Sequence, residues 1–380
     1  MTKEPQRWNN FVNYYQDQLN ELSQQHQPDL IGFDGDWKHT SEEWKAPQTL
    51  TNLRKFKKDI IINSRLNQHG DYAPPEQGVP VVATYDEYWE LCYTKNDSWG
   101  YQSFDMHYKT PNMIVRTLAD VISMDGNLLI DIGPKADGTI VKEQLDVLEN
   151  LGRWTKKYPE AIHGTRRGLD SKNYLGKSAF SKDGKKLFLY LDRNKEHISL
   201  HGLQTEVLNL KMLNDNAAKL DFKTDKKENL DIDITHANYD QDVSVIEISF
   251  KKKPKFVEPT LESIFDFNQI INSKNTKQSV YQLAEEVSKT NNVGLFEKYG
   301  FTEDGQNMNV KTQNCDIKNW LSKHDEAFYN TGYSLPSGHY DGLTTLSKYL
   351  QILYFFVDGK PNDPIAIKVE KSNFAGKNCW

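Results

Sequence analysis

The chain has 380 residues, of which 37% are apolar and 12% aromatic, and this composition excludes a disordered or collagen-like polypeptide. Its 47 basic and 53 acidic residues give a formal net charge of −6, which argues against a nucleic-acid-binding protein. The length predicts two or three domains with a sizeable apolar core.

Neither a membrane anchor nor a metal site is expected from the sequence. No apolar stretch is long enough to cross a bilayer, and residues 1–28 read as a polar helix rather than a signal peptide. Cys92, Cys315 and Cys379 lack the spacing of metal ligands or of a disulfide framework. The chain also lacks phosphate-binding and dinucleotide-binding glycine motifs and a serine nucleophile elbow.

The first 160 residues alternate between helical and strand-like patterns. Apolar residues recur at helical spacing from Trp8 to Leu22, and a short apolar run follows that ends at Asp34-Gly35-Asp36. Short, fully apolar strands between amphipathic helices are typical of a parallel sheet covered by helices. The predicted strands are 30–33, 60–63 and 127–132, and the further helices are 49–58, 114–124 and 141–154.

After about Thr165 the pattern changes to that of an antiparallel β domain. Short strands are predicted at 187–191, 230–234 and 246–250, the last two with strict alternation of apolar and polar residues. The basic run 251–255 then reads as a solvated linker.

The tail of the chain, from about 279 to 368, resembles a second, diverged copy of residues 114–202. The copy has no counterpart of the Phe33-Asp34-Gly35 segment, so chemistry is expected in the first copy. Matching residues recur 166 positions apart: Trp154, Glu160-Ala161, Thr165, Gly176, Ser181, Leu187 and Asp192 return as Trp320, Glu326-Ala327, Thr331, Gly342, Ser347, Leu353 and Asp358. Weaker matches link Leu118-Ala119-Asp120 to Leu283-Ala284-Glu285, and Ala136-Asp137-Gly138 to Glu303-Asp304-Gly305.

Candidate catalytic residues follow the predicted parallel strands, where α/β folds place their working groups. Asp34 and Asp36 close the first strand beside Trp37, and Arg65 follows the second. A carboxylate beside an indole ring suits attack on a sugar, because aromatic rings pack on sugar C–H surfaces. Alternatively, Asp34-Gly35 forms only a turn and Asp36 caps the next helix.

General acid/base chemistry requires a second carboxylate from another loop. Asp71 and Glu76 lie on a proline-containing segment, and Glu90 lies among apolar residues, where a structural role is the alternative. Arg65 could bind sugar hydroxyls or pair with a carboxylate. Asn96-Asp97-Ser98 fits a glycosylation sequon, but its aromatic surroundings favour a buried structural role.

Taken together, the motifs resemble the α-L-fucosidases of glycoside hydrolase family 29. The resemblance covers residues 8–165 densely and weakens through the β domain to about 250. It rests on Pro28-Asp29-Leu30-Ile31-Gly32-Phe33-Asp34-Gly35-Asp36-Trp37, Asn63-Ser64-Arg65, Gly70-Asp71-Tyr72 with Glu76, Trp89-Glu90-Leu91-Cys92, Asn96-Asp97-Ser98-Trp99-Gly100-Tyr101, Gly126-Asn127-Leu128-Leu129, Ile132-Gly133-Pro134-Lys135-Ala136-Asp137-Gly138 and Glu160-Ala161-Ile162-His163-Gly164-Thr165.

The resemblance implies a role for each candidate. Asp34 matches the family's nucleophile, and Glu76 matches the acid/base of several bacterial members and is preferred to Glu90. Arg65 matches a sugar-contacting arginine, Trp99 an aromatic residue near the fucose methyl group, and Trp37 a wall of the pocket. The resemblance further implies a fucosylated glycan as substrate, no cofactor, and a secreted, periplasmic or lysosomal location.

The fold that the resemblance implies is an α/β region plus an all-β region. Residues 1–165 would form the C-terminal half of a (β/α)8-like barrel, residues 166–253 an antiparallel β-sandwich, and residues 254–380 the diverged repeat. The chain starts at the helix before the nucleophile strand, so the family's first strands and sugar-binding histidines have no counterpart in it. Two functions follow as alternatives: a retaining α-L-fucosidase, or a non-catalytic, fucosidase-like carbohydrate-binding protein.

Overall fold

The computed structural model describes residues 4–81, 88–213, 220–226, 228–259, 276–290, 315–328, 331, 334–335, 338–347 and 351–368. These residues form two compact units. The first unit contains residues 1–78, 83–94 and 126–131, and the second contains residues 79–82, 95–125 and 132–380. Each unit is described by itself.

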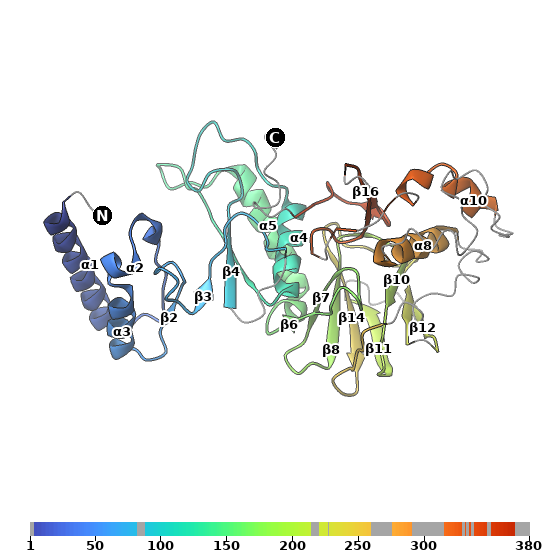
Figure 1. The fold of residues 1–380 in the computed structure, drawn as a ribbon, viewed down its shortest axis with the longest axis horizontal. Coiled ribbons are helices and arrows are strands. Elements are labelled where there is room, and N and C mark those ends of the chain that lie inside the picture. Colours follow the sequence, from blue (N-terminus) through green and yellow to red (C-terminus); the bar gives the residue numbers. More distant parts are fainter. Residues whose placement is uncertain are drawn as a thin grey trace. The chain divides into compact units, whose positions relative to one another are not determined.

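The first unit is an α/β structure whose strands pair in parallel (Figure 1). Strand β1 pairs with β2, and β3, β4 and β5 follow as a second parallel set. A parallel bridge between Asn63 and Tyr72 connects the end of β2 to the start of β3. The elements are α1 (Pro5–His26), β1 (Leu30–Ile31), η1 (Asp36–Lys38), α2 (Ser41–Trp44), α3 (Ala46–Phe56), β2 (Ile61–Ile62), β3 (Tyr72–Ala73), β4 (Tyr88–Tyr93) and β5 (Asn127–Ile130).

Helices α1 and α3 pack against each other in this unit. Their core is apolar and includes Leu53 of α3 and Ile62 of β2, both fully buried. Where α2 follows η1, Trp8 of α1 stacks on His39 with ring centroids 3.6 Å apart, and Trp44 meets Trp8 edge-on. These contacts explain why the predicted alternation of helix and strand folds as a layered unit.

The second unit is built on antiparallel sheets, as predicted for the region after Thr165. One sheet has the order β11-β14-β8-β7-β6 and another has the order β10-β13-β12. Helices α4 and α5 pack together, and α4 contacts β6 and β7 (Figure 1). The elements are α4 (Pro111–Ser123), α5 (Lys142–Lys157), η2 (Pro159–Ala161), β6 (Arg166–Arg167), β7 (Lys177–Phe180), β8 (Lys186–Leu191), β9 (Arg193–Asn194), β10 (His197–Leu200), β11 (Val207–Met212), β12 (Asp221–Thr224), β13 (Leu230–Asp233) and β14 (Ser244–Phe250).

The predicted strand at 246–250 lies within β14, which is buried on both faces although its apolar and polar residues alternate. Ile246 and Ile248 lie in the core between the sheets. On the other side, Val243 and Val245 join a core with Trp154 of α5. Glu247 is 3% exposed and forms a 2.9 Å ion pair with Lys186, so its polar character does not indicate a solvent face.

Several elements of the C-terminal region lie where the predicted repeat expects them. A shift of 166 positions takes η2 to η3 and β7 to β15, β16 lies within the stretch that β8 predicts, and α8 overlaps the stretch that α4 predicts. Equivalent contacts recur as well: the Thr165 hydroxyl donates to the Ile162 carbonyl at 3.1 Å, and the Thr331 hydroxyl donates to the Phe328 carbonyl at 3.1 Å. The bounds are α8 (Thr276–Thr290), α10 (Cys315–Leu321), η3 (Asp325–Ala327), β15 (Leu343–Leu346), β16 (Leu353–Phe356) and β17 (Lys360–Pro361).

The sequence match at Glu303-Asp304-Gly305 lies outside the described residues, as does Cys379. The predicted boundaries at 165 and 253 remain predictions. Within the part of the chain that the structure describes, no helix is both long enough and apolar enough to span a membrane.

Candidate active site

Arg65 brings two of the predicted catalytic carboxylates together in the first unit. Its Nη1 donates a 2.7 Å hydrogen bond to Oδ1 of Asp34, and its Nη2 forms an ion pair with Oε1 of Glu76. Nη2 also donates to the Pro74 carbonyl at 3.1 Å. Both carboxylates therefore lie within reach of one guanidinium group.

The parallel strands explain how these side chains meet. Asp34 lies three residues after β1, and Arg65 lies three residues after β2. Since the carboxyl ends of parallel strands meet at one edge of a sheet, both side chains emerge on the same side. Glu76 forms a parallel bridge with Cys92 of β4, which anchors the segment after β3 beside the next strand.

Asn63 fixes this geometry, and sequence reasoning gave it no role beyond its place in a motif. Its side-chain amide accepts from the Phe33 backbone N–H at 2.8 Å and donates to the Phe33 carbonyl at 2.9 Å. This pair of hydrogen bonds continues the β1–β2 pairing up to the residue before Asp34. The signal in the sequence is a polar residue at the end of an apolar strand. In the structure this residue, Asn63, is 6% exposed.

The loop carrying Glu76 passes very close to the end of β2. A Cβ atom on Gly70 would lie 2.3 Å from the backbone of Asn63, so only glycine fits there. The Ser64 N–H donates to the Tyr72 carbonyl at 2.8 Å, which ties the two segments together. The close approach brings the proline-containing segment next to Arg65.

The environment of Arg65 favours its charged form. Partial burial opposes the charge, but the hydrogen bonds and negative charges of Asp34 and Glu76 outweigh it and raise the pKa of Arg65. The Arg65 side chain is 20% exposed, whereas the Asp34 and Glu76 side chains are 69% and 40% exposed. The cation thus lies deeper than the carboxylates, which face solvent.

Asp71 does not join this cluster. Its Oδ2 accepts from the backbone N–H of Ile62 at 2.9 Å, and its Oδ1 accepts from Arg54 at 2.7 Å. Both carboxylate oxygens therefore hold β2 and α3, and the side chain has a structural role.

Glu90 lies on β4 and is half-buried. Burial raises the pKa of its carboxyl group. Burial and the charge of Glu90 also raise the pKa of the neighbouring Cys92 thiol and of the Tyr72 hydroxyl.

The remaining candidates are Asp36, Trp37 and Trp99. Asp36 begins η1, and its Oδ2 accepts from the Asn67 backbone N–H at 2.6 Å, which favours the structural interpretation. Trp37 lies in η1 and is 65% exposed. Trp99 belongs to the second unit and is 42% exposed.

The loop around Trp99 holds a cluster of polar side chains. Asp97, Asp105 and His107 are, in the described ranges, the one group close enough together to share a metal ion. However, Asp105 already accepts hydrogen bonds from Asn96, Ser98 and His107. Asn96 is 3% exposed, which agrees with a buried structural role for this asparagine.

An α/β region with paired carboxylates at the ends of parallel strands is typical of glycoside hydrolases. The comparison with known families gives the same class: residues 1–160 match the model of the family described as alpha-L-fucosidase. Residues 1–160 are thus similar to the α-L-fucosidases of glycoside hydrolase family 29.

Curated relatives are similar over the same part of the chain. The tissue α-L-fucosidase of Rattus norvegicus is 32% identical over 161 residues, which cover 39% of this chain and 35% of the relative. The α-L-fucosidase of Dictyostelium discoideum is 28% identical over 158 residues and is covered to 34%. The chain thus spans about a third of the length of the curated relatives it matches.

Solved structures are similar over a longer stretch. Isoenzyme 1 from Paenibacillus thiaminolyticus shares 30% identity with a TM-score of 0.57, covering 64% of this chain and 63% of that one. A Bacteroides thetaiotaomicron GH29 enzyme, solved as a trapped covalent intermediate in complex with 2-fluoro-fucosyl fluoride, shares 20% identity with a TM-score of 0.58. The similar region covers 66% of this chain and 63% of the Bacteroides chain. At 20% identity the similarity shows the fold alone.

Proposed function

We propose that this chain carries the two catalytic carboxylates of a retaining α-L-fucosidase, with Asp34 as nucleophile and Glu76 as acid/base. The observation that carries the proposal is the shared contact of both carboxylates with Arg65. The match of residues 1–160 to the α-L-fucosidase family model supports the choice of fucose as the sugar.

In this mechanism Asp34 attacks the anomeric carbon of a terminal α-L-fucosyl unit while Glu76 protonates the departing glycosidic oxygen. The product is a fucosyl ester on Asp34. Glu76, now a carboxylate, takes a proton from water, and that water cleaves the ester and regenerates Asp34. Such retaining pairs have carboxyl groups about 5 to 5.5 Å apart, which is compatible with two groups bound to one guanidinium.

Arg65 would have two functions in this reaction. It holds the carboxylates at a fixed separation before substrate enters, and its N–H groups can donate to sugar hydroxyl oxygens when substrate displaces one of the present contacts. Trp37 remains a proposed wall of the pocket, and Trp99 a proposed contact of the fucose methyl group.

The proposal extends to the fold and the domains. The parallel strands of residues 1–165 would be the C-terminal half of a (β/α)8-like barrel, followed by a β-sandwich at 166–253 and the repeat at 254–380. The parallel pairing of β1 with β2 and of β3, β4 and β5 supports this arrangement. The substrate would be a fucosylated glycan.

An aryl α-L-fucoside assay on the full chain tests the proposal. Asp34→Ala should lower kcat by at least about a thousandfold, because the covalent step is lost. Asp29→Ala is a matched control, since Asp29 precedes β1, is exposed and pairs with Lys57. Azide should partly restore turnover to Asp34→Gly, because a small anion can occupy the emptied position.

The alternative is a non-catalytic carbohydrate-binding protein. This alternative is favoured because Arg65 already binds both carboxylates. A substrate must break at least one of these two contacts. Equal background release by the intact chain and by Asp34→Ala would select this alternative.

A further inference from the structure

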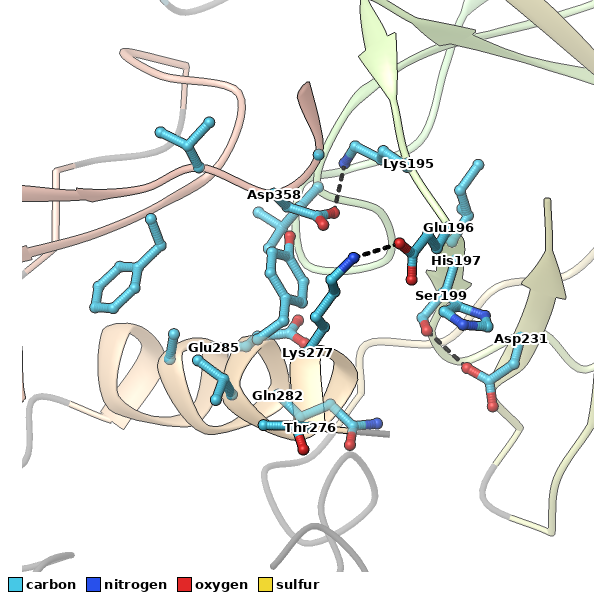
Figure 2. Close-up of a pocket in the computed structure, with 18 of the residues that line it drawn as sticks. Lys195, Glu196, His197, Ser199, Asp231, Thr276, Lys277, Gln282, Glu285 and Asp358 are labelled. Carbon is cyan, nitrogen blue, oxygen red and sulfur yellow. Dashed lines mark hydrogen bonds and ion pairs between the residues drawn. The ribbon is translucent and has the colours of Figure 1, made fainter. Parts of the chain in front are cut away.

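The second unit contains a cavity of about 1520 Å³ that none of the proposed catalytic residues line. Strand β10, helix α8 and the segment from β16 to β17 surround it (Figure 2). The volume exceeds the roughly 300–1,000 Å³ of ordinary small-molecule sites, so it can hold more than one sugar unit.

The cavity begins where two antiparallel segments separate. Lys360 of β17 pairs with Asn194 of β9. From this pair the two segments diverge, one towards β16 and the other towards β10. Gly359 adopts a φ of 81° at the divergence, close to the Asn194 carbonyl. A 3.5 Å ion pair between Lys195 and Asp358 closes this end of the cavity (Figure 2).

The predicted repeat relates two aromatic residues of the cavity to residues of the first copy. In the first copy, Trp154 donates to the Val243 carbonyl at 2.8 Å beside β14, and Phe188 of β8 is fully buried. Their counterparts in the second copy are Trp320 and Tyr354, both of which line the cavity. Among the described residues, the sheet containing β16 consists of β15 and β16.

Two aromatic positions of the cavity carry more polar residues than the matching positions of the first copy. The core tyrosine Tyr158 corresponds to His324, and the core residue Phe188 corresponds to Tyr354. His324 is exposed and stacks on Trp320 with ring centroids 4.3 Å apart. Aromatic rings with polar edges are suited to a hydrated ligand rather than to a dry core.

The opposite wall supplies hydrogen-bonding groups. Ser199 of β10 donates to Asp231 at 2.6 Å, and Lys277 of α8 pairs with Glu196 at 2.5 Å (Figure 2). Five lysines and five carboxylates are among the described lining residues, so positive and negative side chains balance. A balanced set of charges favours a neutral ligand over an anion or a cation.

We infer that this cavity is a second carbohydrate-binding site, which holds a neutral oligosaccharide between the Trp320–Tyr354 wall and the Ser199–Asp231 wall. The ring faces pack on sugar C–H surfaces, and the serine, carboxylate and ammonium groups bind hydroxyls. The chemistry of the cavity carries this inference, and only the choice of a fucosylated probe rests on the proposed function.

The test is calorimetric or NMR-detected binding of lactose and of a lactose-based trisaccharide with a terminal α-L-fucose to the full chain. Both sugars should bind, and Tyr354→Ala should weaken each by about tenfold, the effect of losing one aromatic contact. Tyr354→Phe should retain binding, and Asp231→Asn should weaken it. Asp221→Asn, on the exposed strand β12, is the control for a surface carboxylate that does not line the cavity.

Arg65→Ala separates this site from the proposed catalytic site. If Arg65→Ala abolishes all sugar binding while folded Tyr354→Ala and Asp231→Asn bind normally, the cavity is not a carbohydrate site. Absence of lactose binding, or a clear preference for a sulfated sugar or an extended peptide over neutral sugars, would also overturn the inference. None of these results bears on fucoside hydrolysis, which is measured separately.

Discussion

Asp34 and Arg65 are 31 positions apart in the sequence, yet their side chains are joined by a 2.7 Å hydrogen bond at the ends of two paired parallel strands. The same guanidinium binds Glu76, which arrives from a third segment. The arrangement concentrates two acidic groups around one cation on a solvent-facing edge, and the predictions below follow from it.

Arg65→Met should lower kcat/KM by about a hundredfold, because it removes charged hydrogen bonds worth about 1.5–3 kcal/mol at the reacting groups. Arg65→Lys should recover only part of the loss, since an ammonium group cannot bind both carboxylates in fork geometry. Arg54→Met is the control, because Arg54 pairs with Asp71 instead. Equal losses in the Arg54 and Arg65 variants would show that Arg65 acts only through folding.

Glu76→Ala should slow fucosides with poor leaving groups by about 10²–10⁴-fold and leave strongly activated ones much less affected, because only poor leaving groups need protonation. Glu90→Gln should show no such dependence on the leaving group. The measurement is a series of aryl fucosides of graded leaving-group acidity. A steep dependence in Glu90→Gln, with a flat one in Glu76→Ala, would transfer the acid/base role to Glu90.

Asp71→Ala should destabilise the chain by about 1–3 kcal/mol, because it leaves the N–H of buried Ile62 without its acceptor and Arg54 without its carboxylate. Turnover per folded molecule should change little. Urea unfolding combined with active-fraction kinetics checks both parts. A large loss of turnover without loss of stability would give Asp71 a catalytic role.

Asp240 should make stability sensitive to acid. Burial opposes its ionisation, but Arg153, Lys157 and the Asp242 N–H outweigh burial and lower the pKa of Asp240 to about 2. A carboxyl group with a lowered pKa stabilises the fold above its unfolded pKa, near 3.9, and this contribution disappears as pH falls towards 2.

Asp240→Asn should therefore cost about 3–5 kcal/mol at neutral pH, the effect of breaking a buried ion pair. It should also flatten the decline in unfolding free energy between about pH 4 and pH 2. Asp146→Asn, an exposed partner of Lys142, should change neither quantity appreciably. An unchanged acid limb in Asp240→Asn would show that other groups dominate the acid transition.

Local patterns predicted much of the fold. The helix from Trp8 to Leu22 lies within α1, and the predicted helix 114–124 corresponds to α4, because an apolar stripe at helical spacing must be buried. The predicted repeat was suggested by matching residues such as Thr165 and Thr331, whose hydroxyl groups make equivalent hydrogen bonds in the structure. The strand at 246–250 was predicted from its alternation, but the sequence did not show that β14 packs against a layer on each face.

The candidate site was only partly visible in the sequence. The rule that side chains gather at the carboxyl ends of parallel strands indicated Asp34 and Arg65, and it left Glu76, Asp71 and Glu90 as alternatives. Which of them meets Arg65 depends on the close approach at Gly70 and on the pairing of Glu76 with Cys92, which are long-range contacts. The two hydrogen bonds between Asn63 and the Phe33 backbone were missed for the same reason, because they too are long-range contacts.

Covalent trapping tests the central claim most directly. The full chain is incubated with 2-fluoro-fucosyl fluoride, digested, and analysed by mass spectrometry for a peptide carrying the fluorosugar. The account predicts one labelled peptide with the sugar on Asp34, and no label in Asp34→Ala. A label on another residue, or an active chain that is never labelled, would contradict it.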